Sequence, residues 1–550
     1  MDWYKKIKPL IRKEWVLLSL LLLAFLLRIV GVGYGLPLAV VNDEAPYTFA
    51  ALLMIQLHTI LPALHPEFQT VLYYPPYLSY ILLVPFSVIL GLQYLLWHGA
   101  PALFQAHVLL DLSPFFVAAR LVTVLLGTAS VYLVYRIAEK LFRSRVAASA
   151  AAFLLATSVL HEALSMVGRQ WLPVSFVFLV VLFLLVKDTW SVRRRYLTAF
   201  AAAGIGMGIS AISALACLLI GIYYLCFDAP KFRHIMRDVP LLMLGALIFF
   251  ALAVLAWLLY HGGHNFLGTI SLHQQKTLVD FLMSPWSAIR LIVFSEPVLV
   301  GLSALGMIFC ALSAKRIGTL IAAFFAVYVA AFYVLFYFEG RFVVPLVPFL
   351  SILGGYAISR LWGRRFAAFV CILLVIPLLV AGRLSYLSMQ SDTRALAREW
   401  VLENLKPNDR VLVFSSALHI STQKAAVKEL RSIEPTALRK IDEADEAMDR
   451  RDVPYVLNNL TSISESVFAK NLPQYARQHD YTYVVIELRS LPGMPAMAES
   501  LASLTKDASV AVRFDGFEAP MSLWESAFTE PFIVLFQPKL LGPNIVIYRL

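Results

Sequence analysis

The segment Val41-Asn42-Asp43-Glu44-Ala45 follows the first long hydrophobic run of the chain and places two carboxylates side by side. The sequence has no lysine or arginine between Val30 and Phe116 that would neutralise them. Ionisable side chains at or within a membrane are costly to bury, and they usually serve a function. The acidic pair therefore has two interpretations at this point: a functional site at the membrane surface, or a solvated loop that holds two acids.

The composition around this segment is that of an integral membrane protein. Of the 550 residues, 60% are hydrophobic and only 15% are charged, and the mean hydropathy is +0.75. These values exclude an ordinary soluble domain. Runs of roughly 20 mostly apolar residues, the length that spans a bilayer, recur from Trp15 to Leu387.

The charge is divided unevenly along the chain. Residues 1–389 carry 28 Lys/Arg and 14 Asp/Glu, and residues 390–550 carry 18 and 21, so the net +11 is the sum of +14 and −3. In a membrane protein a basic excess indicates cytoplasmic loops, and it gives no reason to expect nucleic acid as a partner. We therefore predict two domains: a membrane domain over 1–389 and a soluble domain over 390–550.

About eleven transmembrane helices are predicted, and the positive-inside rule orients them. They are expected at 15–30, 114–135, 146–162, 172–186, 196–209, 211–227, 239–260, 291–312, 317–337, 342–359 and 366–387. With a cytoplasmic N-terminus, the inside segments hold 21 Lys/Arg and the outside loops hold four: Arg169, Lys276, Arg290 and Arg341. This bias predicts that Asp43 and the C-terminal domain lie outside the cytoplasm, in a multi-pass protein of the plasma (inner) membrane.

The segment 75–97 is apolar enough to span, but a crossing there would turn most of the basic loops outward. Pro75, Pro76 and Pro85 also disfavour a regular helix. We interpret the segment as a helix that lies in or dips into the outer face; the alternative is a true span with a second crossing near 98–113. The outer loops are then 31–113, with helical pieces at 46–61 and 77–97, and 261–290.

The C-terminal region alternates between helical and strand patterns, which predicts a small α/β domain. The segment 392–405 is amphipathic, and strands are expected at 410–415, 481–488, 532–536 and 544–549.

Several short motifs occur in the order and spacing of a known family. They are Asn42-Asp43-Glu44-Ala45, Tyr73-Tyr74-Pro75-Pro76-Tyr77-Leu78, Ala118-Ala119-Arg120-Leu121, Leu141-Phe142, Glu339-Gly340-Arg341-Phe342 with Pro345 and Pro348, and Thr393-Arg394 with Trp400-Val401 and Asn404-Leu405. Together they resemble the GT-C glycosyltransferases, in particular the protein O-mannosyltransferases and bacterial aminoarabinose transferases that use polyprenyl-phosphate sugars. The resemblance covers most of residues 1–405. It implies a GT-C-like helical fold, an outer-face active site, a lipid-phosphate-linked sugar donor and inversion at the anomeric carbon.

Asp43 matches the first acid of that family's Asp-Glu pair and is our candidate general base. Transfer of a sugar to a hydroxyl needs a base for the acceptor proton and cations for the departing phosphate. Glu44 is given a catalytic supporting role; the alternative is a structural acid favoured at a helix N-terminus.

The few outer cations are the candidate phosphate ligands. Arg341 lies between two apolar helices, where its guanidinium suits phosphate; the alternative is an ion pair with Glu339. Lys276 and Arg169 are the other candidate phosphate ligands, with a solvated loop as the alternative for Lys276. The expected substrate-binding residues also include Tyr74 and His65, although aromatic side chains at an interface often serve only as anchors. Arg28 is expected to snorkel at the outer end of the first helix, and Arg120 to be an interfacial or structural residue.

One departure from the family pattern concerns a second acid. Family members often carry it shortly after an arginine in the loop that here reads His161 to Pro173, and no acid follows Arg169. Either Glu162 takes that role from the other end of the loop or the role is absent. We therefore expect no cofactor and leave a divalent cation as the alternative, since His65 with Glu67, or His161 with Glu162, lacks a recognised ligand spacing.

The leading prediction is an integral-membrane glycosyltransferase with a polyprenyl-phosphate sugar donor and an outer-face acceptor (protein, lipid or glycan). The alternatives are a transporter or lipid flippase and a non-catalytic accessory subunit. Transporters tend to show internal repeats and charge near the bilayer midplane, whereas this sequence shows no evident repeat and almost no midplane charge. The sequence leaves the sugar and the acceptor open.

Overall fold

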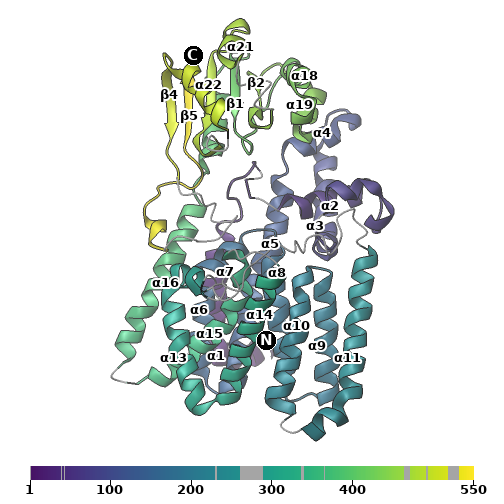
Figure 1. Cartoon of the computed structure of the whole chain (residues 1–550), viewed down its shortest axis with the longest axis vertical. Coiled ribbons are helices and arrows are strands. Elements are labelled where there is room, and N and C mark those ends of the chain that lie inside the picture. The colour runs from purple at the N-terminus through teal and green to yellow at the C-terminus, as the bar shows by residue number, and fades with distance from the viewer. Residues whose placement is uncertain are drawn as a thin grey trace.

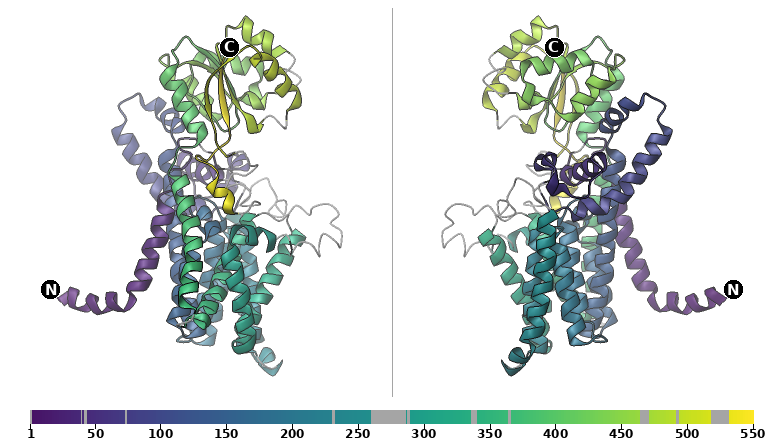
Figure 2. Two further views of the ribbon diagram at one scale, coloured as in Figure 1. Left: turned by 90° about the vertical axis from the view of Figure 1, so that its left-hand side faces the viewer. Right: turned by 90° about the vertical axis from the view of Figure 1, so that its right-hand side faces the viewer.

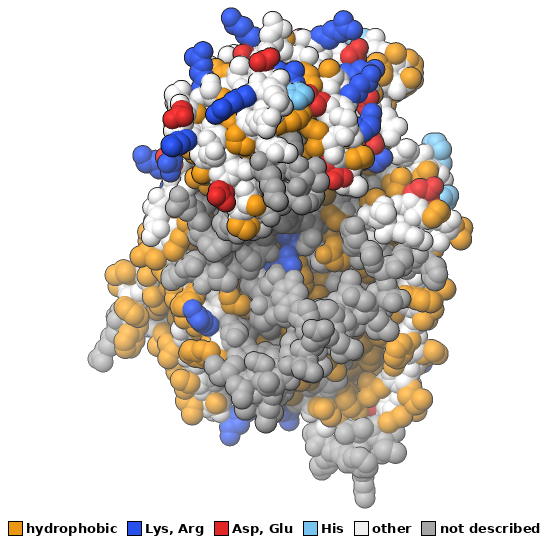
Figure 3. Space-filling view, turned by 45° about the horizontal axis from the view of Figure 1, so that its top comes forward, with side chains coloured by type: hydrophobic (Ala, Val, Ile, Leu, Met, Phe, Trp, Pro, Cys, Tyr) orange, Lys and Arg blue, Asp and Glu red, His pale blue; other side chains and the backbone are white. Residues whose placement is uncertain are grey.

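Long apolar runs fold into a bundle of helices, with a small α/β domain standing at one end of it (Figure 1). The computed structural model describes the chain except residues 1, 39, 42–43, 73, 230–231, 260–285, 287–288, 336–339, 364–365, 464–470, 491–493 and 518–531. Two further views show the α/β domain above the bundle and the N-terminus beside its lower half (Figure 2). Hydrophobic side chains cover much of the sides of the bundle, whereas charged side chains gather over the α/β domain (Figure 3).

Each predicted span coincides with helical structure in the bundle. Its helices are α1 (Asp2–Ile29), α5 (Ser113–Phe142), α6 (Arg145–Ala156), α7 (Val159–Ser165), α8 (Trp171–Leu185), α9 (Val192–Met207), α10 (Leu215–Tyr223), α11 (Phe232–Leu259), α13 (Pro297–Ser313), α14 (Lys315–Leu335), α15 (Val347–Leu361) and α16 (Ala367–Ser388). Three short helical segments adjoin them: η4 (Ala211–Ala214), η5 (Tyr224–Asp228) and η6 (Gly340–Leu346).

Within the described residues, seven helices are long and apolar enough to cross a membrane, or eight if α6 and α7, which meet at 58°, form one broken span. The chain is thus a multi-pass membrane protein. The predicted spans at α8 and α13 fall among the shorter apolar helices.

A layer of helices and 3₁₀ turns lies between the bundle and the α/β domain. It contains α2 (Ala45–Gln56), α3 (Tyr77–Leu96) and α4 (Phe104–Leu110), with 3₁₀ turns η1 (Pro62–Leu64), η2 (Pro66–Thr70) and η3 (Pro101–Leu103). Helix α3 is long and apolar enough to span, and it lies beside α2 in this layer (Figure 1). Its first residue is held to the bundle, because the Tyr77 amide donates to the Gly208 carbonyl at 2.8 Å.

The α/β domain has a five-stranded sheet of order β2-β1-β3-β5-β4. The strands are β1 (Arg410–Phe414), β2 (Tyr455–Leu457), β3 (Tyr483–Glu487), β4 (Ser509–Phe514) and β5 (Ile545–Arg549). The first three are parallel and β5 is antiparallel to both β3 and β4. A parallel strand with helices on both sides needs a continuous apolar run, and residues 411–414 of β1 are all buried.

The helices of this domain are α17 (Thr393–Asn404), α18 (Lys424–Ile433), α19 (Lys440–Met448), α21 (Leu472–Gln478) and α22 (Pro495–Thr505), with the 3₁₀ turns η7 (Pro435–Ala437), η8 (Leu460–Ser462) and η10 (Leu488–Ser490). The predicted helix at 392–405 and three of the four predicted strands are confirmed. Helix α19 packs on α4 of the intermediate layer, so the domain is docked on the outer loop 31–113.

The predicted strand at 532–536 is wrong. These residues form the 3₁₀ turn η11 (Phe532–Phe536), which packs on α16. The Arg383 side chain of α16 donates to the Leu535 carbonyl at 3.1 Å, so a contact distant in sequence takes the backbone group that a sheet would pair. The sequence also missed β2, which has three residues, and β4, an exposed edge strand.

Acid should weaken the α/β domain through Asp442. Burial by itself raises the pKa of this carboxyl, but interactions with His419 and the Arg439 guanidinium outweigh it and lower the pKa from 3.8 to about 2. Because the folded pKa lies below the unfolded one, the ionised group stabilises the domain above about pH 4, and this contribution of about 2 kcal/mol is lost as the pH falls toward 2. The measurement is hydrogen exchange of the β1 amides in the full chain, corrected for intrinsic rates.

Asp442→Asn should reduce the protection of the β1 amides against exchange at pH 7. In this variant the protection should also fall less between pH 5 and pH 2 than in the unmodified chain. The exposed Asp507→Asn variant, with the same charge change, should behave like the unmodified chain. An unchanged acid dependence in Asp442→Asn would show that another group governs it.

Candidate active site between the helix bundle and the C-terminal domain

Glu44 forms the centre of a buried ionic cluster where α2 begins. Both of its carboxylate oxygens accept from Arg120 of α5: Nε reaches Oε1 at 2.8 Å and Nη2 reaches Oε2 at 2.7 Å. The two side chains are 0% and 1% exposed. Arg120 also donates through Nη1 to the carbonyls of Val32 and Tyr34, each at 2.8 Å. The guanidinium therefore ties the chain after α1 to the start of α2.

The loop between α7 and α8 is attached to the same carboxylate. The Gly168 amide donates to Glu44 Oε1 at 2.7 Å. A Cβ at Gly168 would lie 2.9 Å from the Ala119 Cβ, so only glycine permits this approach to α5. The next residue, Arg169, is 1% exposed. The predicted phosphate ligand Arg169 is thus carried by a loop that is fixed directly to Glu44.

An aromatic contact brings Arg341 to the same region. The rings of Trp171, at the start of α8, and Phe342, in η6, lie 4.6 Å apart between centroids. The Arg341 guanidinium lies 5.4 Å from the Phe342 ring centroid. The Tyr328 hydroxyl of α14 holds η6 by donating to the Phe342 carbonyl at 2.7 Å. The contact between Trp171 and Phe342 therefore places the segments that carry Arg169 and Arg341 side by side.

Tyr74 lies against the beginning of α2. Its ring stacks on Tyr47, with centroids 5.2 Å apart and planes at 12°, and Tyr47 is fully buried. Tyr74 is therefore close to the helix that Glu44 begins. His65 lies instead at the start of η2, where its ring makes an edge contact with Phe68 at 6.4 Å. No described contact of His65 reaches the Glu44 cluster.

Two predicted site residues, Asp43 and Lys276, lie outside the described residues, as does Glu339, the predicted alternative partner of Arg341. Their roles remain predictions. The residue that follows Asp43 in the chain is the anchored Glu44.

The prediction that Arg28 snorkels to the surface is wrong. Arg28 is fully buried, and it donates through Nη1 to Ala156 O at 2.9 Å and through Nη2 to Leu155 O at 3.1 Å. Its Nη2 also lies 3.0 Å from His161 Nδ1. Leu155 and Ala156 are the last residues of α6, where the break before α7 leaves carbonyls without helical partners. A cation at a helix C-terminus also interacts favourably with the helix dipole.

The other side of the break is held by an acid that the sequence reading did not single out. Glu296 Oε1 accepts from Ser158 Oγ at 2.6 Å and from the Leu160 amide at 3.0 Å. Glu296, at the start of α13, thereby accepts a hydrogen bond from a backbone amide at the N-terminus of α7, while Arg28 donates to backbone carbonyls at the C-terminus of α6. An acid directly before Pro297 predicts a cap of α13, but the Glu296 side chain makes no cap hydrogen bond to its own helix. The sequence signal therefore could not have identified its contact with the start of α7.

Glu162, which we considered as a substitute second acid, lies on α7 and is fully buried. Its Oε1 accepts from Ser385 of α16 at 2.7 Å, and Oε2 has no hydrogen-bond partner among the described residues. Glu162 thus contacts α16, and no described contact links it to Glu44.

Removing the Glu296 carboxylate should destabilise the α6–α7 break. Glu296→Ala would leave the Ser158 hydroxyl and the Leu160 amide buried without an acceptor, which costs about 1–3 kcal/mol per group. We expect a clear fall in the thermal unfolding midpoint of the purified full chain. Glu296→Gln keeps an acceptor oxygen at the same place and should retain most of the stability. Equal losses in the two variants would assign the effect to charge and not to capping.

The α/β domain is joined to this region by a second buried cluster. The Tyr34 hydroxyl donates to Asp392 Oδ2 at 2.6 Å, and Arg394 Nε donates to Asp392 Oδ1 at 2.8 Å. Tyr34 is the residue whose carbonyl Arg120 holds. One continuous set of hydrogen bonds therefore links Glu44, Arg120, the chain after α1 and the start of the C-terminal domain.

The described residues contain no group of three or more His, Cys, Asp or Glu side chains close enough to hold a metal ion. The Arg120 guanidinium and the Gly168 amide are bonded to Glu44, and Arg169 is a further buried cation on the adjoining loop.

Comparison with known proteins finds one similar family model and several similar solved structures. Residues 112–257 match the family model described as dolichyl-phosphate-mannose-protein mannosyltransferase. Comparison with curated proteins found no match. Among solved structures, the chain is similar to ArnT from Cupriavidus metallidurans bound to undecaprenyl phosphate, at 13% identity and a TM-score of 0.50, covering 97% of this chain and 98% of that one.

A second similar structure is the archaeal oligosaccharyltransferase AglB from Archaeoglobus fulgidus in complex with an inhibitory peptide and a dolichol-phosphate. It shows a TM-score of 0.49 at 13% identity and covers 92% of this chain and 74% of that one. The predicted fold class is confirmed: the chain is a polytopic helical membrane protein of the GT-C fold with a C-terminal α/β domain. It resembles the GT-C glycosyltransferases that depend on polyprenyl phosphate.

Proposed function

We propose that the chain is an integral-membrane glycosyltransferase that transfers a sugar from a polyprenyl-phosphate-linked donor to an acceptor on the membrane face where the α/β domain stands. The supporting observation is the cluster in which Arg120 and Gly168 anchor Glu44, directly after Asp43, with Arg169 on the same loop. The family match over 112–257 and the undecaprenyl phosphate bound to the similar ArnT support the donor class. The sugar is a hexose or a pentose, and the acceptor a protein, lipid or glycan.

The proposed reaction is one displacement with inversion. Asp43 accepts the proton of the acceptor hydroxyl as its oxygen bonds to the anomeric carbon. The bond between that carbon and the phosphate oxygen breaks, and the polyprenyl phosphate leaves with the electron pair and a negative charge. Arg341, Arg169 and Lys276 stabilise this charge, with Arg suited to bidentate contact with phosphate. Tyr74 and His65 are proposed substrate contacts.

Glu44 acts in this proposal as a positioning residue. Both of its oxygens accept hydrogen bonds from a buried guanidinium, and one also accepts from the Gly168 amide. A carboxylate in this environment cannot give up Arg120 without leaving a buried charge unpaired. Its effect on catalysis is therefore to hold the start of α2 against the loop that carries Arg169.

The positive-inside distribution supports a cytoplasmic N-terminus and an extracytoplasmic C-terminal domain in a plasma (inner) membrane. We place the boundary between the membrane domain and the soluble domain at residues 389 and 390.

The test is an assay of the purified full chain with radiolabelled undecaprenyl-phosphate pentose and hexose donors and a panel of outer-surface acceptors. Acceptor-dependent release of free undecaprenyl phosphate is expected for at least one donor. Binding of the donor without release would favour an accessory subunit, and movement of intact donor across a vesicle membrane would favour a flippase.

We further propose that transfer needs no metal ion, since cationic side chains supply the charge that a divalent ion would otherwise provide. Addition of EDTA to the assay should change the initial rate by less than about twofold, whereas loss of an essential ion removes several kcal/mol of transition-state stabilisation. Loss of activity in EDTA, restored by Mn²⁺ or Mg²⁺, would contradict this proposal.

A further inference from the structure

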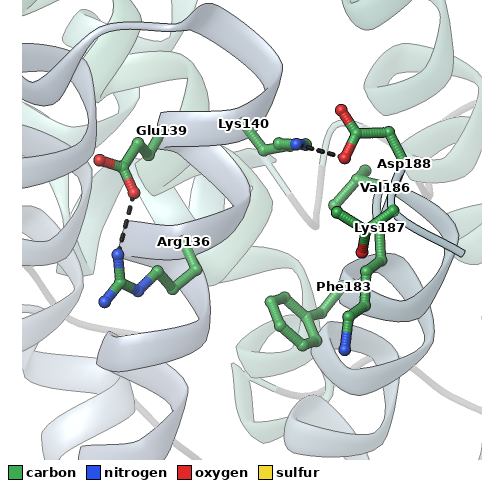
Figure 4. Close-up of a pocket in the computed structure, with 8 residues that line it drawn as sticks. Arg136, Glu139, Lys140, Phe183, Val186, Lys187 and Asp188 are labelled. Carbon is green, nitrogen blue, oxygen red and sulfur yellow. Dashed lines mark hydrogen bonds and ion pairs between the residues drawn. The ribbon is translucent and has the colours of Figure 1, made fainter.

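A cavity of about 360 Å³ opens at the end of the bundle far from the α/β domain. It lies between the last turns of α5 and α8, and Figure 4 shows the side chains that line it, among them Arg136, Lys140 and Lys187. Helix α5 begins three residues after α4, beside the α/β domain, and has 30 residues, so its far end lies about 45 Å away. The cavity is therefore separate from the site around Glu44.

The cavity wall holds more positive than negative charge. Arg136 Nη1 pairs with Glu139 at 3.1 Å and with Glu14 of α1 at 3.7 Å, and Lys140 pairs with Asp188 at 2.5 Å. Lys187 lies with its ammonium 3.9 Å from the Trp190 ring centroid, and it has no carboxylate partner among the described residues. An ammonium held against an aromatic ring at the mouth of a cavity keeps its charge available to an anion.

From Arg136 back toward the middle of α5, the exposed surface of this helix is apolar. Leu125 is 60% exposed and Tyr132 is 38% exposed. With Arg136 they occupy positions i, i+7 and i+11, which lie on one face of a helix. A lipid with an anionic headgroup could contact the cations at the membrane surface with that headgroup. Its acyl chains could then pack on the exposed apolar face of α5 within the hydrocarbon layer. Phe183 and Val186 of α8 form the opposite wall of the cavity.

We propose that this cavity binds the phosphate headgroup of an anionic membrane phospholipid, with Lys187 contacting the phosphate and the acyl chains following the exposed face of α5. Basic pockets between transmembrane helices are suited to such headgroups, and each basic side chain near a membrane surface contributes about 1 kcal/mol of attraction to anionic lipid. Glu139 and Asp188 pair with Arg136 and Lys140, which leaves Lys187 as the cation that contacts the phosphate. This site is independent of the proposed transfer reaction.

The test titrates the purified full chain in neutral detergent with dioleoylphosphatidylglycerol and follows the thermal unfolding midpoint. Dioleoylphosphatidylcholine and inorganic phosphate are titrated in parallel. The midpoint should rise with phosphatidylglycerol and not with phosphatidylcholine. Lys187→Gln should need about fivefold more phosphatidylglycerol for half of the effect, the factor that corresponds to about 1 kcal/mol.

The matched control is Lys315→Gln at the start of α14, an exposed lysine with no ion pair among the described residues. It should respond to phosphatidylglycerol as the unmodified chain does. Equal responses to the two lipids, or equal shifts in Lys187→Gln and Lys315→Gln, would overturn the proposal. A response to inorganic phosphate as large as that to phosphatidylglycerol would assign the cavity to a soluble phosphate and overturn the lipid assignment.

Discussion

Asp43→Asn is expected to reduce the rate of sugar transfer by about 10²- to 10⁴-fold, the contribution typical of a general base. Asparagine has nearly the same shape as aspartate, but its amide cannot accept the acceptor proton at neutral pH. The fall should therefore occur in kcat, with little change in the thermal unfolding midpoint. The measurement is the initial rate of undecaprenyl phosphate release by the purified full chain.

The matched control for Asp43→Asn is Glu67→Gln, which removes another acid from the same outer loop at an exposed position in η2. It should leave the rate nearly unchanged. Asp43→Glu keeps a carboxylate on a side chain that is one methylene longer, and it should retain part of the activity that Asp43→Asn loses. Transfer at a near-normal rate in Asp43→Asn would remove Asp43 as the base, even if the chain proved to be a glycosyltransferase.

Glu44→Ala should destabilise the chain by about 3–5 kcal/mol, because it leaves the buried Arg120 guanidinium without its counter-ion. The Gly168 amide loses its acceptor in the same change. The measurements are the yield of monodisperse protein and the thermal unfolding midpoint.

An exposed ion pair supplies the control for Glu44→Ala. Lys440 and Glu443 lie 3.1 Å apart with side chains 80% and 51% exposed. Glu443→Ala should have little or no effect, since water screens such pairs. If Glu44→Ala proved as mild as Glu443→Ala, Glu44 could not be the anchor of the loop that carries Arg169.

Arg120→Lys separates the roles of charge and geometry in the same cluster. Lysine keeps the positive charge but cannot reproduce the two parallel bonds to Glu44 together with those to Val32 and Tyr34. The variant should therefore be intermediate in stability between the unmodified chain and Glu44→Ala.

Local patterns account for the parts of the fold that the sequence predicted correctly. A helix that spans a membrane satisfies its own backbone hydrogen bonds, so its position follows from hydrophobicity along a single segment. The same holds for β1, where residues 411–414 form a short apolar run. Segment 532–536 was assigned wrongly because its apolar character suits a strand and a helical turn equally, and its contact with α16 decided between them.

Contacts between distant residues account for the parts that the sequence did not predict. Glu44 and Arg120 are 76 positions apart, and Ser158 and Glu296 are 138 apart, so no local period or spacing pairs them. Arg28 illustrates the same limit, because an arginine near a helix end can either reach the surface or turn inward. The broken helix α6–α7 offers unsatisfied carbonyls, and this made the buried position favourable.

The sequence by itself determined the membrane bundle, the soluble α/β domain, the motif set of the GT-C class and the small number of outer cations, because each depends on composition, order or spacing along the chain. Only the tertiary structure decided that Glu44 is clamped by Arg120, that the Arg169 loop is fixed to it, and that Arg341 approaches through Trp171 and Phe342. The physical reason is that a buried charge must find its partner wherever folding places one, and that choice is made among segments far apart in the chain.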